Sequence, residues 1–121
     1  MVNMKLKAIY IDDEPELLEM FSELFSNEHI EIKTFSDTEK GLAAIAHENP
    51  HLVILDYRLK DTTGDKLAQK ISSKIPKILI SGDLSIHQDP HFIKIFRKPI
   101  EMSEMTEFLE LQFKKLITLT S

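Results

Sequence analysis

A short apolar run that ends in a carboxylate is the feature that most limits how this chain can fold. Leu52 to Leu55 are four consecutive apolar residues, with Pro50 before them and Asp56 directly after them. Four residues are too few for a helix, and an unbroken apolar run is typical of a strand buried on both faces of a parallel sheet. Because ligands of open α/β sheets bind at the carboxyl ends of strands, Asp56 is a candidate functional residue. Taken alone, however, an Asp in this position more often opens a turn.

Four further strand patterns alternate with helical patterns along the chain. Strands are predicted over residues 5–11, 29–35, 77–81 and 92–96, and helices over residues 15–26, 36–48, 67–71 and 103–118. Segment 82–91 has room for one or two helical turns at most, because it must also contain two loops. This order predicts an α/β fold with a doubly wound, five-stranded parallel sheet, formed by residues 1–121 as a single domain.

Two local signals refine the loops between these elements. Ser36 and Glu39 are three residues apart and predict a capping box at the start of the second helix. Gly64 follows the polar loop after Asp56, where a glycine is free to take a positive φ.

The composition excludes several classes of function. A net charge of −5 provides no basic surface for nucleic acid or anionic lipid. No apolar run approaches the roughly 18 residues of a membrane span, and the amino terminus lacks a signal-peptide pattern. The absence of cysteine excludes disulfides, zinc-thiolate sites and thiol nucleophiles. These observations favour a cytoplasmic protein without membrane insertion or direct nucleic-acid binding.

Five residues with reactive side chains end the predicted strands, namely Asp12, Asp13, Asp56, Ser81 and Lys98. If the strands are parallel, all five lie at one edge of the sheet. Three clustered carboxylates repel one another, so they require positive charge from the lysine and from a divalent cation. Oxygen ligands without His or Cys favour Mg²⁺ over zinc. A hydroxyl and an ammonium beside the cation form a receptor for a tetrahedral anion, as in aspartyl-phosphate chemistry.

With these residues in this order, the chain resembles the receiver domains of two-component response regulators over nearly its whole length. The motifs that carry the resemblance are IDDEPE, VILDYR, ILISG and FRKP. The resemblance implies a flavodoxin-like sheet with strand order 2-1-3-4-5. It also implies a cis peptide bond before Pro99.

The resemblance further implies a role for each residue of the site. Asp56 would be the phosphoacceptor, while Ser81 and Lys98 would bind the phosphoryl group. Mg²⁺ would be held by Asp12, Asp13, Asp56 and the backbone carbonyl of Arg58. The phosphoryl donor would be a phosphohistidine of a sensor histidine kinase or phosphotransfer protein, and phosphorylation would change protein–protein interaction. Such a domain assists its own phosphorylation and dephosphorylation but is not an enzyme with an external product.

The chain departs from the family pattern at several positions. An aromatic residue usually stands three residues before the lysine, where this chain has Ile95, and Phe96 is predicted to point to the opposite face of its strand. Lys60 stands where a proline is typical. The segment between Ser81 and Lys98 is shorter than usual, so the fourth helix of the family is expected to be short or absent. These departures affect the expected output surface rather than the phosphorylation site.

Other interpretations of the sequence stay open. One is a degenerate receiver that acts as an interaction module without phosphorylation. Another is a haloacid-dehalogenase-type phosphatase, although that family has an Asp-x-Asp pattern where this chain has Asp12-Asp13-Glu14. The downstream partner and the oligomeric state, including a homodimer, are not identified by the sequence.

A pair of histidines also imitates the spacing of a zinc site. His87 and His91 are four residues apart, with Asp83 and Asp89 nearby. Pro90 interrupts any helix that would align the two rings, so a zinc site is the less favoured interpretation.

Overall fold

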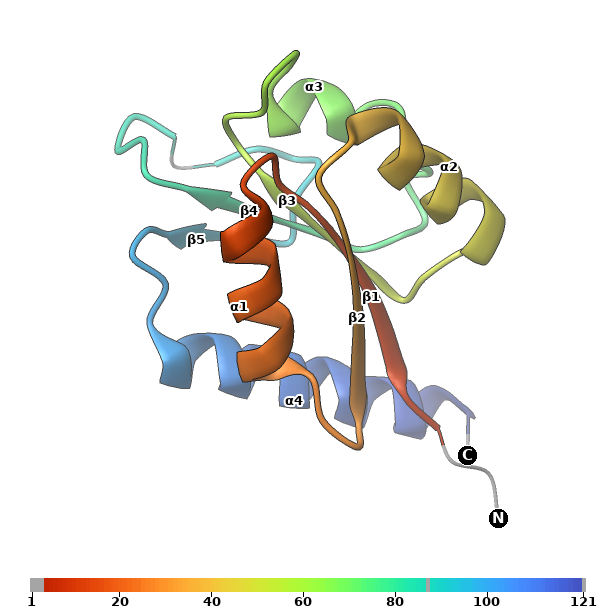
Figure 1. The fold of residues 1–121 in the computed structure, drawn as a ribbon. Helices are drawn as coiled ribbons and strands as arrows, with labels where there is room; N and C mark the ends of the chain where they lie inside the picture. Colours follow the sequence, from red (N-terminus) through yellow and green to blue (C-terminus); the bar gives the residue numbers. More distant parts are fainter. Residues whose placement is uncertain (1–3, 87, 121) are drawn as a thin grey trace.

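The structure is a computed structural model that describes residues 4–86 and 88–120. Its centre is a five-stranded parallel sheet with the strand order β2-β1-β3-β4-β5 (Figure 1). The elements in chain order are β1 (Leu6–Ile11), α1 (Pro15–Phe25), β2 (Ile30–Phe35), α2 (Thr38–Glu48), β3 (Leu52–Asp56), α3 (Gly64–Ala68), β4 (Lys77–Ser81), β5 (Lys94–Arg97) and α4 (Met102–Thr120). The predicted fold class and strand order are therefore confirmed.

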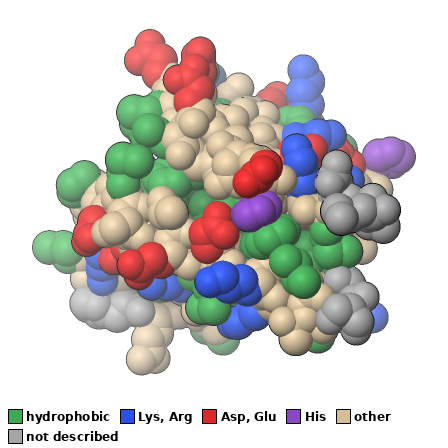
Figure 2. All heavy atoms as spheres, turned by 90° about the horizontal axis from the view of Figure 1, so that it is seen from below, with side chains coloured by type: hydrophobic (Ala, Val, Ile, Leu, Met, Phe, Trp, Pro, Cys, Tyr) green, Lys and Arg blue, Asp and Glu red, His purple; other side chains and the backbone are tan. Residues whose placement is uncertain are grey.

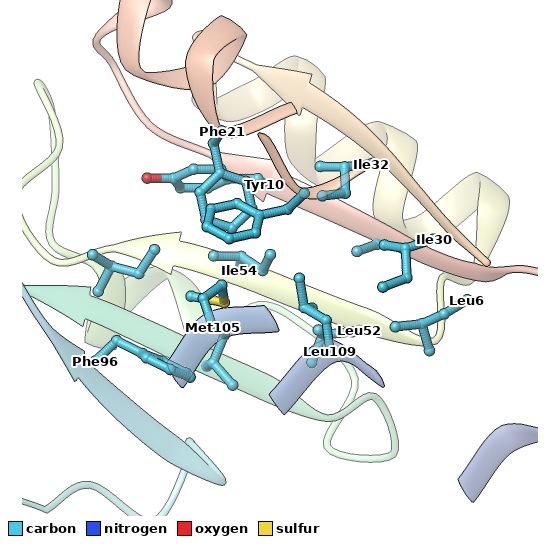
Figure 3. Packing of buried hydrophobic residues seen from close by; sticks show 14 of the residues in the cluster. Leu6, Tyr10, Phe21, Ile30, Ile32, Leu52, Ile54, Phe96, Met105 and Leu109 are labelled. Carbon is cyan, nitrogen blue, oxygen red and sulfur yellow. The ribbon is translucent and has the colours of Figure 1, made fainter. Parts of the chain in front are cut away.

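The sheet separates two apolar layers, and helices lie over both of its faces (Figure 1). α1 and α4 cover one face, where Tyr10, Phe21 and Met105 belong to a single buried cluster (Figure 3). α2 and α3 cover the other face, where Ile9 and Ile45 belong to the second cluster. Successive residues of a strand point to opposite faces, so each strand contributes to both layers.

The neighbouring strands β3 and β4 contain no exposed residue. Every residue of β3 and of β4 is buried, and Leu52 to Leu55 are each at most 1% exposed. The apolar run is thus a strand buried on both faces, as predicted. Lys77 is the charged exception in β4, and its ammonium donates hydrogen bonds to the carbonyls of Ser72 (2.7 Å) and Ile75 (2.9 Å). Burial of the ammonium lowers the pKa of Lys77, and these hydrogen bonds replace contacts with water that the buried ammonium loses.

The start of α2 differs from the prediction. The N-cap is Asp37, whose carboxylate accepts a hydrogen bond from the backbone N–H of Lys40 at 2.9 Å, so the predicted capping box of Ser36 and Glu39 is wrong. β2 continues to Phe35, and the chain needs one more residue to turn into the helix. Asp also has a charge that favours the positive end of the helix dipole.

Gly64 is required for a reason other than the predicted one. No glycine in the described part of the chain has a positive φ, and Gly64 is the first residue of α3. A Cβ at this position would lie 2.5 Å from the carbonyl oxygen of Asp56 and 2.7 Å from Cδ1 of Leu79. Gly64 therefore allows the start of α3 to lie directly against the end of β3.

The crossover between β4 and β5 has no helix in the part that the structure describes, residues 82–86 and 88–93, which agrees with the predicted short or absent fourth helix. β5 begins at Lys94 rather than at Phe92, because the N–H of Phe92 bonds to the carbonyl of Asp89 in a turn. The zinc alternative involves His87, which lies outside the described residues. Nδ1 of His91 lies 2.7 Å from Oδ1 of Asp89.

α4 is amphipathic along its length. Met105, Leu109 and Phe113 are buried against the sheet, whereas Leu111 and Leu119 are exposed. α4 lies on the lower side of Figure 1, and the view from below in Figure 2 shows acidic, basic and apolar side chains interspersed on that face. Within the described residues, none of the helices combines the length and apolar character that crossing a membrane requires.

Candidate functional site

Parallel pairing brings the ends of four strands to one edge of the sheet. Asp12 directly follows β1, Asp56 ends β3, Ser81 ends β4, and Lys98 directly follows β5. The backbone N–H of Lys98 donates to the carbonyl of Ser81 at 3.0 Å, which extends the ladder beyond β5. Asp12, Asp13 and Asp56 each offer a carboxylate oxygen, and these three oxygens lie within 4.8 Å of one another. The structure thus gathers the residues that the sequence predicts.

Asp56 is paired with the ammonium group of Lys98. Oδ1 of Asp56 lies 2.7 Å from Nζ of Lys98, and the Asp56 side chain is 5% exposed. Burial raises the pKa of the Asp56 carboxyl above its usual range, although the hydrogen bond and the charge of Lys98 act in the opposite direction. Burial lowers the pKa of Lys98, but its bond to Asp56 outweighs that effect, and the net result is a raised pKa. The peptide bond between Lys98 and Pro99 is cis, as expected.

Asp12 is held on both of its oxygens. The hydroxyl of Tyr10 donates to Oδ2 at 2.8 Å, and the backbone N–H of Glu14 donates to Oδ1 at 3.0 Å. Asp12 is 1% exposed, and burial raises the pKa of its carboxyl from 3.8 to about 6, against the effect of these hydrogen bonds. Burial and the Asp12 charge also raise the pKa of Tyr10.

Tyr10 is the residue of the site that sequence reasoning missed. It lies within the strand predicted over residues 5–11, where the apolar pattern explains its ring and gives no role to its hydroxyl. Its position two residues before Asp12 was the available signal, because residues i and i+2 of an extended chain point to the same face.

Ser81 is connected to the loop that follows β4. Its Oγ accepts a hydrogen bond from the backbone N–H of Asp83 at 3.0 Å, and Ser81 is 1% exposed. Asp83 is bound in turn by two arginines: Nη1 of Arg97 donates to its carbonyl at 2.6 Å, and Nη2 of Arg58 lies 3.5 Å from its Oδ2. The hydroxyl of Ser81 therefore lies at the start of a loop that Arg58 connects to the segment after β3 and Arg97 connects to β5.

The charges at this edge fit a divalent cation. Three carboxylates face one ammonium, and two of the carboxylates, Asp12 and Asp56, have raised pKa values because they are buried. A cation of charge +2 would balance the remaining negative charge. Carboxylate oxygens are the ligands that Mg²⁺ prefers, and the cluster contains no His or Cys.

Solved structures share this fold. A signal receiver domain of an HD domain-containing protein from Pseudomonas fluorescens matches with a TM-score of 0.81 at 18% identity, over 94% of this chain and 98% of that chain. A response regulator receiver domain protein from Clostridium thermocellum also has a TM-score of 0.81, at 20% identity, over 93% of this chain and 98% of that chain.

Curated proteins with similar sequences are named as regulators. The probable transcriptional regulatory protein TcrX of Mycobacterium tuberculosis is 35% identical over 69 residues, which are 57% of this chain and 30% of that protein. The regulatory protein VanR of Enterococcus faecium is 28% identical over 120 residues, which cover 90% of this chain and 52% of that protein. The chain therefore spans at most about half the length of these two relatives.

A family model described as the response regulator receiver domain matches residues 8–110, a range that begins in β1, ends in α4 and contains every residue of the site. Receiver domains generally bind Mg²⁺ through acidic residues and interact with histidine kinases or phosphotransfer proteins. The chain belongs to the family of response regulator receiver domains, which act in two-component signalling.

Proposed function

We propose that Asp56 accepts a phosphoryl group from the phosphohistidine of a sensor histidine kinase or phosphotransfer protein, and that this changes the affinity of the domain for a partner protein. The proposal takes residues 1–121 as one receiver domain. The observation that carries it is the buried Asp56 carboxylate with Lys98 at 2.7 Å, inside a cluster of three acids at the strand ends.

The proposed transfer needs no residue outside this edge of the sheet. A carboxylate oxygen of Asp56 attacks the phosphorus, and the P–N bond to the donor imidazole breaks. The imidazole nitrogen leaves with the electron pair and takes up a proton, and Asp56 becomes an acyl phosphate. The ammonium of Lys98 already lies at the carboxylate, where it can pair with a phosphoryl oxygen. The Ser81 hydroxyl can donate to a second oxygen.

Asp12, Asp13, Asp56 and the backbone carbonyl of Arg58 are the groups proposed to hold Mg²⁺. When bound, Mg²⁺ would neutralise negative charge on the carboxylates and on the phosphoryl oxygens. The protein itself contributes the rigid placement of the ligands, because Asp56 ends a fully buried strand and Asp12 is bound on both oxygens. The only reaction proposed for the domain is its own phosphorylation and dephosphorylation.

One observation favours a second candidate function. Ile95, where the family usually has an aromatic residue, packs at the edge of the cluster beneath α2 and α3, whereas Phe96 is buried beneath α4. An aromatic side chain is thus absent from the position that would follow movement of Ser81. This favours an interaction module whose binding does not depend on phosphorylation.

One experiment separates the two candidates. The protein is incubated with Mg²⁺ and phosphoramidate, a small donor with a P–N bond, and its intact mass is then measured. We expect the mass of one added phosphoryl group on the wild type and none on Asp56→Asn. Asp61→Asn, which removes an exposed acid from the loop after β3, is the matched control and should be phosphorylated like the wild type. No addition to the wild type, or equal addition to Asp56→Asn, would remove the proposal and leave the interaction module.

A further inference from the structure

We propose that Tyr10 is a positioning residue for the cation site, because its hydroxyl holds the Asp12 carboxylate in the orientation that binds the ion. The inference rests on the proposed function, in which Asp12 is a ligand of Mg²⁺. It assigns a role in cation binding to a core residue whose ring would otherwise be explained by packing alone.

The two donors on Asp12 come from opposite sides of the residue in the sequence. Tyr10 lies two residues before it and binds Oδ2, while Glu14 lies two residues after it and binds Oδ1. One hydrogen bond on each oxygen fixes both the position and the plane of the carboxylate. Each carboxylate oxygen can accept more than one hydrogen bond or ligand, so both oxygens keep a lone pair for a cation.

The ring of Tyr10 makes the hydroxyl a fixed anchor. Tyr10 is 1% exposed, and its ring packs against the edge of Phe21 in α1, with the centroids 4.8 Å apart and the planes at 66°. Figure 3 shows the ring beside Phe21, with its oxygen pointing away from the labelled apolar side chains. Because the ring cannot turn without disturbing this cluster, the hydroxyl keeps its direction toward Asp12.

A neutral donor suits this position better than a charged one. The carboxylates of Asp12, Asp13 and Asp56 repel one another at separations within 4.8 Å, and repulsion favours rotation of Asp12 away from the cluster. The phenol opposes this rotation with a hydrogen bond and leaves the negative charge of the cluster available to the cation. Outer partners that orient metal ligands typically contribute about 10- to 100-fold in metal affinity. We expect about tenfold for Tyr10, since Glu14 continues to hold the other oxygen.

The test compares Mg²⁺ affinity, measured by isothermal titration calorimetry at about pH 8, where the Asp12 carboxyl, with its pKa of about 6, is ionised. Tyr10→Phe keeps the ring and removes only the hydroxyl. Tyr57→Phe makes the same chemical change at the residue beside Asp56 and is the matched control. We expect Tyr10→Phe to bind Mg²⁺ about tenfold more weakly than the wild type and Tyr57→Phe to bind it like the wild type.

Two further measurements separate positioning from a general effect on folding. At saturating Mg²⁺, Tyr10→Phe should be phosphorylated by phosphoramidate at close to the wild-type rate, because only cation binding is impaired. In an Asp12→Asn background, removing the Tyr10 hydroxyl should change Mg²⁺ affinity by less than about twofold, since the Asp12 carboxylate that the hydroxyl positions is already absent.

The possible failures are distinguishable. A wild-type protein that does not bind Mg²⁺ would overturn the cation site and this inference together. Mg²⁺ binding by the wild type with equal affinity in Tyr10→Phe would overturn the positioning role alone. An equal loss of affinity in the presence and absence of the Asp12 carboxylate would also overturn it, because the hydroxyl would then act through the fold rather than through Asp12.

Discussion

Replacing Asp12 by asparagine is expected to stabilise the protein at neutral pH in the absence of divalent cations. Burial raises the pKa of the Asp12 carboxyl from 3.8 to about 6. The folded protein therefore binds the proton more tightly than the unfolded chain, and the free energy of unfolding falls as the pH rises from about 4 to about 6. Asparagine has nearly the same shape as the protonated acid but does not ionise, so it avoids this loss.

The size of the effect follows from the same pKa values. A rise from 3.8 to about 6 corresponds to about 3 kcal/mol at about 1.4 kcal/mol per pKa unit. The hydrogen bonds from Tyr10 and Glu14 are stronger to a charged acceptor and lower the pKa, so their effect is already included in the value of about 6. The gain expected near neutral pH is therefore about 2–3 kcal/mol.

Urea unfolding followed by circular dichroism, with a chelator present, measures the gain at about pH 7.5 and about pH 4. At the lower pH, Asp12 of the folded wild type is protonated, so the difference between the two proteins should largely disappear. Adding Mg²⁺ should stabilise the wild type more than Asp12→Asn, because only the wild type has the full ligand set. Asp61→Asn removes an exposed acid and should show little change at either pH.

Two results would contradict this reasoning. One is an Asp12→Asn variant no more stable than the wild type at about pH 7.5, which would mean that ionised Asp12 is not penalised in the fold. The other is a gain of equal size at about pH 4, which would show that the stabilisation does not come from removing an ionisable group.

Three further substitutions test other parts of the structure. Gly64→Ala should lower the free energy of unfolding by about 2–3 kcal/mol, since its Cβ would overlap the Asp56 carbonyl. Gly82→Ala is the control, because the nearest atom to its Cβ would be 3.8 Å away, and it should change the free energy of unfolding by less than about 1 kcal/mol. Urea titration measures both. Lys98→Met should reduce the rate of phosphorylation from phosphoramidate about tenfold or more, measured by intact mass over time, because it removes the ammonium paired with Asp56. Phe96→Ala should lower the free energy of unfolding, measured by heat or urea, by about 3–5 kcal/mol. Ile95→Ala should lower it by less than half as much, because of the two side chains only Phe96 is fully buried. Equal losses would contradict the assignment of the two side chains to opposite faces.

The ends of the central strands could be predicted because burial on both faces requires an apolar residue at nearly every position. Leu52 to Leu55 satisfy this requirement, so the position of Asp56 followed directly from it. The start of β5 could not be found in this way. Phe92 is as apolar as a strand residue, but its N–H bonds within a turn, and only the folded chain determines where that bond is made.

The residues that the sequence did not explain depend on contacts between distant segments. The need for glycine at position 64 comes from the carbonyl of Asp56 and the side chain of Leu79, which approach only after β3 and β4 pair. Lys77 contradicts the apolar pattern of a central strand, and its two carbonyl partners become available only where the chain turns before β4. Tyr10 fits the strand pattern, and that pattern carries no information on the hydrogen bond that its hydroxyl donates to Asp12.

The two strands at the margins of the sheet, β2 and β5, have a consequence for how the protein behaves at high concentration. Each has a neighbouring strand on one side only, so each can present backbone donors and acceptors to another molecule. Glu31 and Lys33 in β2, and Lys94 and Arg97 in β5, place charge on these margins. Charged side chains on an edge strand oppose pairing with a strand of a second molecule. The charges on β2 and β5 therefore oppose the kind of aggregation in which the sheets of successive molecules join edge to edge.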